Sequence, residues 1–296
     1  MEQSLVGRII IKAMSLGWLN WMSDSSYLKI MYRIQMGEKL NLKNPKTYNE
    51  KLQWLKIHNR KPVYTVMVDK YAAKDFIAEK IGRQYVVPTL GVWEKFEEID
   101  FDALPAQFVL KCTHDSGGLV VVKNKSQLDK VAANNKIKRS LHNNYYYWTR
   151  EWPYKNVPAR IIAEPYLKDD ALQPNAEQEC LTDYKLFCFN GEPKIMYISK
   201  DKAENPTTDF FDMDFNHLNL RMKDPNSEKL PKKPEKFEEM KEIARKLSKD
   251  IPHLRVDFYC ADNTLYVGEM TFYHCAGMAH ITPKIWEEKM GEWIEL

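Results

Sequence analysis

Residues 254–271 read LRVDFYC, ADNT and LYVGEMT, the pattern of two short strands joined by a polar connector. Alternation along the first strand places Arg255 and Asp257 on one face, while apolar residues take the other face. The second strand can bring Glu269 and Thr271 to the same face as Asp257 if the two strands pair. The pattern therefore predicts a β-hairpin with a charged face.

Two chemical interpretations of this charged face stay open on spacing alone. Two carboxylates that converge beside an arginine form a good site for a hard divalent cation that bridges phosphate oxygens. The alternative is a structural salt bridge between Arg255 and one of the acids, Asp257 or Glu269.

A second hairpin is predicted upstream, at residues 108–112 and 119–122, where FVLKC and LVVV flank the polar connector THDSGG. Lys111 is the charged residue of an otherwise apolar strand, so its ammonium needs an environment that tolerates charge, and phosphate is one candidate. Ser116, Gly117 and Gly118 would let backbone N–H groups approach an anion closely. The sequence is not a Walker loop, and an ordinary glycine turn is the alternative interpretation.

Further strands are predicted at 160–164, where Pro165 follows, and at 183–189 and 193–199, around the turn at Asn190 and Gly191. Asp183 and Lys185 share one face of their strand. Taken alone, they favour a solvated sheet edge over a binding role.

The N-terminal part of the chain, residues 1–105, is predicted to be mainly helical. Thr47 precedes Glu50 by three residues, the spacing of a capping box at a helix start. Other helices are predicted at 64–81, 126–147 and 237–247. We expect residues 202–234, which are rich in Asn, Asp, Lys and Pro, to form an irregular loop.

Composition limits the classes of function. The chain has 296 residues, with 44 basic and 41 acidic side chains, and this balance argues against general nucleic-acid binding. The five cysteines (Cys112, Cys180, Cys188, Cys260 and Cys275) are widely spaced and include no C-x-x-C pair. They predict neither a disulfide framework nor a zinc site, so we expect a protein of the reducing cytosol.

The N-terminal segment 5–22 is apolar but interrupted by charged and polar residues, so it predicts neither a membrane span nor a signal peptide. Ile9, Trp18 and Trp21 could form an amphipathic surface for a membrane, with Arg8 and Lys12 for anionic headgroups. The favoured interpretation is a helix that covers the core.

Some residues of reactive or aromatic type have weaker functional signals. His114 and His274 flank the two candidate sites and could contact substrate, although loop hydrogen bonding explains them equally well. The run Tyr145–Trp148 and the nearby Trp152 and Tyr154 predict packing, with sugar stacking as the sharper alternative.

The order of these features resembles the TupA-like ATP-grasp family, which is associated with teichuronopeptide and capsular polysaccharide synthesis. The resemblance extends from about Tyr32 to Leu296. The segments that carry it are NLKNPKT (41–47), EKLQW (50–54), DKY (69–71), FVLKCTH (108–114), REWPY (150–154), DYKLFCFNG (183–191), RVD (255–257) and GEMTF (268–272).

The resemblance implies an α+β fold of the ATP-grasp type, in which two lobes clamp ATP, with a helical region at 1–105 and a catalytic region at 106–296. By carry-over, Lys111 and Lys185 would hold phosphates, with the Ser116–Gly118 loop beside them. Glu164, Tyr166 and Leu167 would lie against adenine. Asp257 and Glu269 would bind Mg²⁺, and Arg255 would face the transferred phosphoryl group. Thr271 stands where many ATP-grasp enzymes have an asparagine ligand.

The activity that the resemblance implies is a ligase that activates a carboxylate as an acyl phosphate, which an amine then attacks. The expected partners are ATP, a sugar or uronic-acid acceptor that could be lipid-linked, and an amino acid or amine. We expect a cytoplasmic enzyme with at most weak contact at the inner membrane face. A sugar kinase, a polysaccharide-pathway glycosyltransferase and a non-catalytic nucleotide-binding scaffold are the alternatives.

Overall fold

The fold contains two antiparallel sheets with helices around and between them, which confirms the predicted α+β class. The computed structural model describes residues 4–169, 181–200 and 206–296. The smaller sheet has the order β1-β4-β2-β3, and the larger has the order β7-β6-β5-β8-β9. The strands are β1 (Gly91–Trp93), β2 (Phe108–Cys112), β3 (Leu119–Val122), β4 (Ile161–Pro165), β5 (Asp183–Phe189), β6 (Glu192–Lys200), β7 (Thr207–Phe211), β8 (His253–Ala261) and β9 (Thr264–Thr271).

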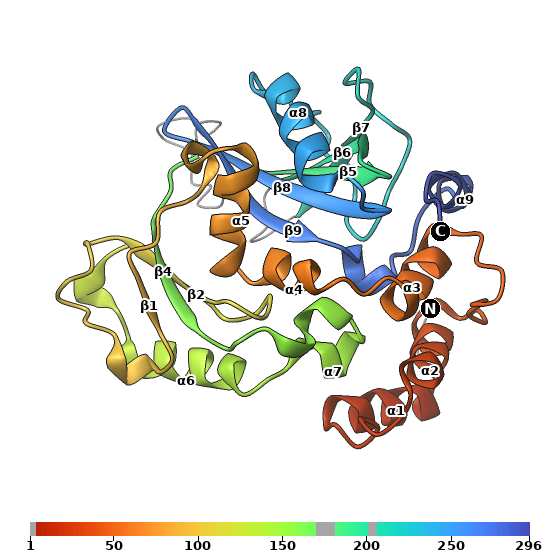
Figure 1. Cartoon of the computed structure of the whole chain (residues 1–296), viewed down its shortest axis with the longest axis horizontal. Helices are drawn as coiled ribbons and strands as arrows, with labels where there is room; N and C mark the ends of the chain where they lie inside the picture. The colour runs from red at the N-terminus through yellow and green to blue at the C-terminus, as the bar shows by residue number, and fades with distance from the viewer. Residues whose placement is uncertain (1–3, 170–180, 201–205) are drawn as a thin grey trace.

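Helices cover both sheets and fill the space between them. Helices α4 and α5 lie between the two sheets, and α8 packs across β5, β6 and β8 (Figure 1). The helices are α1 (Leu5–Ser15), α2 (Asp24–Met36), α3 (Tyr48–His58), α4 (Pro62–Val68), α5 (Ala72–Ile81), α6 (Lys130–Leu141), α7 (Tyr145–Thr149), α8 (Phe237–Ser248) and α9 (Ile285–Glu292). Within the described part of the chain, no helix combines the length and apolarity needed to cross a membrane.

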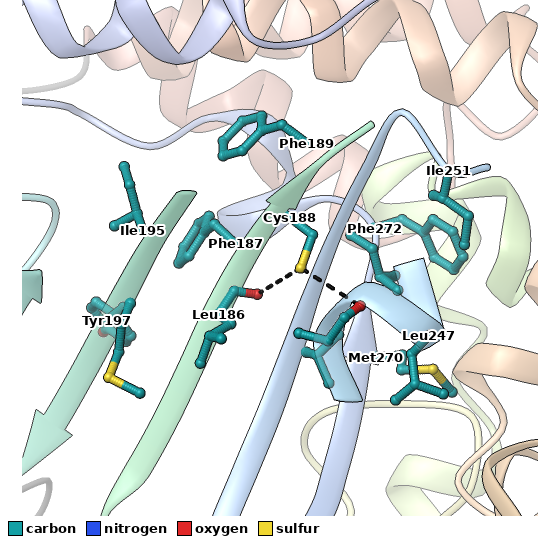
Figure 2. Close-up of a cluster of buried hydrophobic side chains, with 14 of the residues drawn as sticks. Leu186, Phe187, Cys188, Phe189, Ile195, Tyr197, Leu247, Ile251, Met270 and Phe272 are labelled. Atoms are coloured by element: carbon teal, nitrogen blue, oxygen red, sulfur yellow. Dashed lines mark hydrogen bonds between the residues drawn. The ribbon is translucent and has the colours of Figure 1, made fainter. Parts of the chain in front are cut away.

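Strand β5 forms the centre of the larger sheet and is buried along nearly its whole length. Its apolar side chains alternate between two covered faces, so the strand reads as a continuous apolar run after Lys185. Figure 2 shows this core, in which Leu186 and Phe187 pack among side chains of β6, β9 and α8. The core holds in place the charged end of the sheet.

The predicted hairpins and the predicted helix start are confirmed. Strand β2 pairs with β3 through Phe108↔Val122 and Lys111↔Leu119, and β8 pairs with β9. At the start of α3 the Thr47 side chain accepts a hydrogen bond from the Glu50 backbone N–H, and the Glu50 carboxylate accepts one from the Thr47 backbone N–H.

The predicted irregular loop at 202–234 is wrong in one part, because residues 207–211 form strand β7 at the edge of the larger sheet. The segment TTDFF has the β-branched and aromatic residues of a strand, but the polar composition around it masks this signal. Residues 202–205 of that prediction lie outside the described residues, as does Cys180.

Two predicted helices are interrupted. The predicted helix 64–81 divides into α4 and α5, because Asp69 Oδ1 accepts from the backbone N–H groups of Tyr71 and Ala72 and starts a new helix. The predicted helix 126–147 divides into α6 and α7 around Asn144, whose side chain accepts from the Tyr146 N–H. Asp and Asn favour such caps over helix interiors.

The predicted helical region 1–105 contributes a strand as well as helices. Strand β1, at its C-terminal end, pairs with β4 through Gly91↔Ala163 and Trp93↔Ile161. A division of the chain at residue 105 stays a prediction.

Helix α1 buries Met14 and exposes Ile9, which is 60% exposed. In the segment that follows α1, Trp18 and Trp21 are 68% and 81% exposed. The favoured interpretation, in which these three residues cover the core, is therefore wrong for their side chains.

Candidate active site

A narrow cleft separates the two sheets, and its charged lining comes from α5, the segment before it, and strands β2, β4 and β9. Lys70, Lys74, Lys111, Glu164 and Glu269 line it, among apolar residues of α4, β9 and the segment before β1. The open volume is about 30 Å³, room for about one water molecule.

Two lysines, Lys111 of the smaller sheet and Lys74 of α5, share one carboxylate of that sheet. Lys111 Nζ lies 2.5 Å from Glu164 Oε2, and Lys74 Nζ lies 2.6 Å from Glu164 Oε1. Burial would raise the pKa of Glu164, but the charges of Lys111 and Lys74 together hold it below its usual value. Lys74 also donates to the Val87 carbonyl and to Thr89 Oγ1, whereas Lys111 keeps 26% of its side chain exposed. Lys111 is therefore the cation of this pair that can turn toward a ligand.

On the larger sheet, Asp257 is the centre of a buried ionic cluster. Its carboxylate accepts from Arg255 Nε at 2.6 Å, from Arg255 Nη2 at 2.7 Å and from Lys185 Nζ at 2.7 Å. Burial opposes ionisation of Asp257, but the charges of Arg255 and Lys185 hold its pKa well below the usual range. Lys185 also lies 2.9 Å from Asp183. Because the Lys185 side chain is only 13% exposed, the solvated-edge interpretation of this strand is wrong.

The register of the last hairpin brings the predicted metal-binding residues together. Asp257 lies opposite Glu269, and Arg255 lies opposite Thr271. Arg255 Nη2 donates to Thr271 Oγ1 at 3.1 Å and lies 3.9 Å from Glu269. The salt bridge between Arg255 and Asp257 is thus present, and Glu269, 27% exposed, is the carboxylate open to the cleft.

A buried histidine, His274, helps to hold Arg255 in place. Its Nη1 donates to His274 Nδ1 at 2.6 Å. Burial, followed by the charges of Arg255 and Lys185, lowers the pKa of His274 well below its usual value, so the ring is neutral and accepts this bond. His274 therefore positions Arg255. His114 also forms loop hydrogen bonds, to the carbonyls of Ser140 and Asn143.

The remaining predicted residues are more scattered. Ser116 and Gly117 are exposed at the tip of the β2–β3 hairpin and line a pocket on the side of α7, and Ser116 also lines a pocket that contains Arg255 and Glu269. Gly118 is buried, and a Cβ there would collide with Cys112 and Ser140, so the hairpin requires glycine at this position. Tyr166 and Leu167 follow β4, half-buried, and are not among the residues that line the cleft.

The site also contains lysines that the sequence analysis did not assign. Lys70 donates to the Asp115 carbonyl and lies 3.8 Å from Glu269, between the two ionic clusters. Lys74 lies in α5, four residues after Lys70. Two lysines at this spacing beside a buried apolar segment are the signal that could have found them.

The oxygen atoms of the site are of the type that binds magnesium, but the described side chains offer too few of them for a complete coordination shell. In the described part of the chain, no group of three or more His, Cys, Asp or Glu side chains is arranged to hold a metal. Glu269, Asp257 and the Thr271 hydroxyl offer hard oxygen atoms, and Mg²⁺ is commonly bound by one or two carboxylates together with substrate phosphates and water. The residues therefore fit a cation that arrives with a nucleotide.

Comparisons with known proteins place this site in a family. Among solved structures, D-alanine–D-alanine ligase from Helicobacter pylori is 16% identical, with a TM-score of 0.46, and the match covers 85% of this chain and 70% of that one. The corresponding ligase from Bacillus anthracis, solved with ATP, is 16% identical with a TM-score of 0.39, covering 70% and 54%. A phosphoribosylamine–glycine ligase from Thermotoga maritima is 13% identical with a TM-score of 0.39, covering 71% and 48%.

The chain thus spans about half the length of the Bacillus anthracis and Thermotoga maritima ligases. A search of curated proteins found no match. The family model described as TupA-like ATPgrasp matches residues 50–295, which include both sheets and every residue of the two ionic clusters. The chain therefore belongs to the TupA-like ATP-grasp family and has an ATP-grasp fold.

Proposed function

We propose that this protein is a Mg-ATP-dependent ligase that joins a carboxylate to an amine through an acyl phosphate. The observation that carries the proposal is the meeting of two unlike ionic clusters at one cleft. The smaller sheet offers lysines in excess over carboxylate, and the larger sheet offers carboxylates beside Arg255. Phosphoryl transfer from ATP needs cationic groups for the phosphates and hard oxygen ligands for the accompanying metal.

The phosphates would bind at the lysines. Lys111 and Lys185, on facing sheets, would contact them from opposite sides, and Ser116, Gly117 and Gly118 would close over them. Adenine would lie beyond Glu164, against Tyr166 and Leu167. A nucleotide needs a site of several hundred Å³. The cleft of about 30 Å³ therefore has to widen when ATP enters.

The metal would be held by Glu269 and Asp257, with Thr271 beside them. Bound there, Mg²⁺ would neutralise charge on the phosphate oxygens. In the structure, Asp257 uses both carboxylate oxygens to hold Arg255 and Lys185. Glu269 is therefore the principal ligand that the chain offers, and Asp257 joins it by sharing an oxygen.

The chemical step would be carried by Arg255 and Lys185. A carboxylate oxygen of the acceptor attacks the γ-phosphorus, ADP leaves, and an acyl phosphate forms. Arg255, fixed by Asp257 and His274, presents its guanidinium to the charge that develops on the transferred group. Lys185 contributes a second fixed cation. Positioning and charge neutralisation are the main catalytic devices of such a site.

The acceptor would be a uronic acid or a related sugar carboxylate of a surface polysaccharide, as the family assignment suggests. A kinase that phosphorylates a sugar hydroxyl is the second candidate, because the same clusters would serve it. A nucleotide-sugar glycosyltransferase has no comparable support from the site.

Product analysis separates these candidates. The purified chain is incubated with Mg-ATP, D-glucuronate or D-galacturonate, and hydroxylamine, which traps an acyl phosphate as a hydroxamate. The proposal expects ADP, phosphate and hydroxamate in equal amounts. A phosphorylated sugar without free phosphate would establish the kinase, and no ATP turnover with any uronate would contradict the ligase.

The exposed face of α1 supports a working position at a membrane surface, on the cytoplasmic side. Trp18 and Trp21 project with Ile9 from a segment that also carries Arg8 and Lys12. Aromatic and basic residues together favour the interface of an anionic bilayer. Such contact would bring the site close to a lipid-linked acceptor.

A further inference from the structure

A second pocket adjoins the cleft on the other side of Glu269, which lines both. It is lined by residues of α2, α7, the segment 151–154, strands β8 and β9 and the turn that follows β9, together with Ser116, and it has a volume of about 340 Å³. Arg255, Glu269 and Thr271 form its charged wall. A group bound there would therefore lie next to the candidate phosphoryl-transfer site.

The opposite wall is aromatic and contains one further acid. Tyr145 and Tyr154 meet edge to face with their ring centroids 5.1 Å apart, and Tyr273 lies across from them. Glu151 lies among these rings and is only 2% exposed. A carboxylate is almost never buried this deeply without a partner or a task.

The nearest buried cation does not pair directly with Glu151. Lys56 Nζ donates to the carbonyls of Thr149 and Ala276 at 2.8 Å each. Across the described residues, no ion pair within 4 Å includes Glu151, so the charge of Lys56 acts on it over a longer distance. Burial raises the pKa of Glu151, and the charge of Lys56, followed by a hydrogen bond with the Thr149 side chain, partly offsets this rise.

The position of Glu151 suits a proton acceptor for an incoming nucleophile. It shares the pocket with Arg255, the residue assigned to the transferred phosphoryl group, and the two lie near enough to influence each other electrostatically. Aromatic walls exclude water and favour a cationic ammonium over a neutral group. The Asp257 carboxylate is already engaged with Arg255 and Lys185, and Glu269 is assigned to the metal.

We infer that this pocket binds the amine substrate and that Glu151 is the base that accepts its proton. The inference deepens the proposed ligase function and rests on it. The substrate class is a primary amine small enough for the pocket, such as an amino acid.

The proposed step balances as follows. The substrate enters as an ammonium, and a carboxylate oxygen of Glu151 takes one of its protons, which frees the nitrogen lone pair. The lone pair attacks the carbonyl carbon of the acyl phosphate, and a C–N bond forms. The C–O bond to phosphate breaks, and phosphate leaves with the bonding electrons and takes the second proton that the nitrogen loses. General-base assistance of this kind contributes roughly 10²–10⁴-fold in rate.

The test compares two nucleophiles in the same enzyme. Hydroxylamine, at a pH where it is already neutral, should intercept the acyl phosphate without a base. Glycine, L-alanine, L-glutamate, L-lysine and ammonia serve as amine probes, with D-glucuronate and D-galacturonate as acceptors. For Glu151→Gln we expect hydroxamate formation within about threefold of the wild type and an unchanged KM for ATP. Amide formation should fall by about 100-fold or more, with a raised KM for the amine.

A double variant excludes a purely structural role. Glu151→Gln alone leaves the buried Lys56 without a compensating charge and can weaken the fold, so Glu151→Gln with Lys56→Met is assayed in parallel, with circular dichroism to confirm folding. If Glu151 only balances Lys56, the double variant should regain amide formation. If Glu151 takes the proton, the double variant should stay defective in amide formation and competent in hydroxamate formation.

The outcomes are distinguishable. A wild type that forms no hydroxamate overturns the ligase function, and the inference with it. A wild type that forms hydroxamate but no amide overturns the assignment of an amine to this pocket. Amide formation by Glu151→Gln within threefold of the wild type, or its recovery in the double variant, overturns the role of Glu151 while the ligase function stands.

Discussion

The two ionic clusters that face each other across the cleft differ in charge and in burial. Beside the smaller sheet, Lys74 of α5 and Lys111 of β2 share Glu164, and Lys70 lies nearby. Three lysines against one carboxylate leave this side positive. On the larger sheet, Lys185 and Arg255 lie within ion-pair distance of three carboxylates, those of Asp183, Asp257 and Glu269. That side is left with one negative charge. The positive side, around Glu164, therefore suits phosphate, and the negative side, around Asp257, suits a cation.

Burial separates the roles of the individual carboxylates. Asp257 is 1% exposed and is held by two cations, whereas the Glu269 side chain is 27% exposed and keeps only long contacts with Lys70 and Arg255. The first carboxylate organises the cluster, and the second is available to a ligand.

Substitution of the two candidate metal ligands should give the largest effects and should separate these roles. Asp257→Asn removes the counter-charge of two buried cations, so we expect a loss of about 3–5 kcal/mol in unfolding free energy together with loss of turnover. Glu269→Gln should abolish turnover while its unfolding free energy stays within about 0.5 kcal/mol of the wild type. Urea unfolding measures the stability of both variants, and ATPase assays measure their turnover. Equal losses of stability would contradict the assignment of a structural role to Asp257 and a ligand role to Glu269.

Acid should weaken the larger sheet through a buried histidine. Burial lowers the pKa of His253 from 6.5 to about 4, so the unfolded chain takes up a proton at a pH where the folded chain does not. The stability that this group contributes is fully present above pH 6.5 and is lost as the pH falls toward 4. A shift of this size corresponds to about 3 kcal/mol.

The matched variant for this prediction is His253→Gln, which cannot titrate. Urea unfolding at pH 7 and pH 4.5 should show a smaller difference for the variant than for the wild type. An identical pH dependence in both proteins would refute the assignment of this acid sensitivity to His253.

On the smaller sheet, the two lysines that share Glu164 should differ in their effect on ATP. Lys111→Ala should weaken ATP binding by about 1.5–3 kcal/mol, because a charged contact to phosphate is lost. Lys185→Ala should do the same from the opposite sheet. Lys74, tied to the Val87 carbonyl and Thr89, is the control, and its alanine variant should affect folding more than affinity. Calorimetric titration with ATP gives the affinities, and unchanged values for both Lys111→Ala and Lys185→Ala would argue against phosphate contacts.

The smallest expected effect concerns α1, far from both clusters. Trp18→Ser with Trp21→Ser should reduce flotation with anionic vesicles at low salt and leave activity on a water-soluble acceptor unchanged. Wild-type binding should fall as salt rises, because Arg8 and Lys12 contribute electrostatically. Equal flotation of wild type and variant would show that this face does not contact lipid.

Sequence patterns predicted the parts of the site that lie on one local element or on one hairpin. Alternation in β8 and β9 was enough to place Asp257 and Glu269 on one face, because hairpin pairing is local, and the register of the structure then puts them opposite each other. The strand with Asp183 and Lys185 was ambiguous, since nothing in its own residues says whether it is central or at an edge. Its partners, β6 and β8, decide that.

Long-range contacts could not be predicted from patterns. Lys74 and Glu164 are ninety positions apart in the sequence, and Lys56 acts on Glu151 from a different helix. The roles carried over from the family reached Glu164 as an adenine neighbour, but its two lysine partners appear only when β2 pairs with β4 and when Lys74 of α5 reaches the same carboxylate. Charge pairs of this kind are fixed by tertiary packing and have no periodic signature.

The most direct test of the central claim measures ATP affinity with and without Mg²⁺ in the wild type and in Glu269→Gln. If Glu269 holds the metal that accompanies ATP, both proteins should bind ATP equally in EDTA, and Mg²⁺ should tighten binding in the wild type far more than in the variant. An equal gain from Mg²⁺ in both proteins would contradict the account.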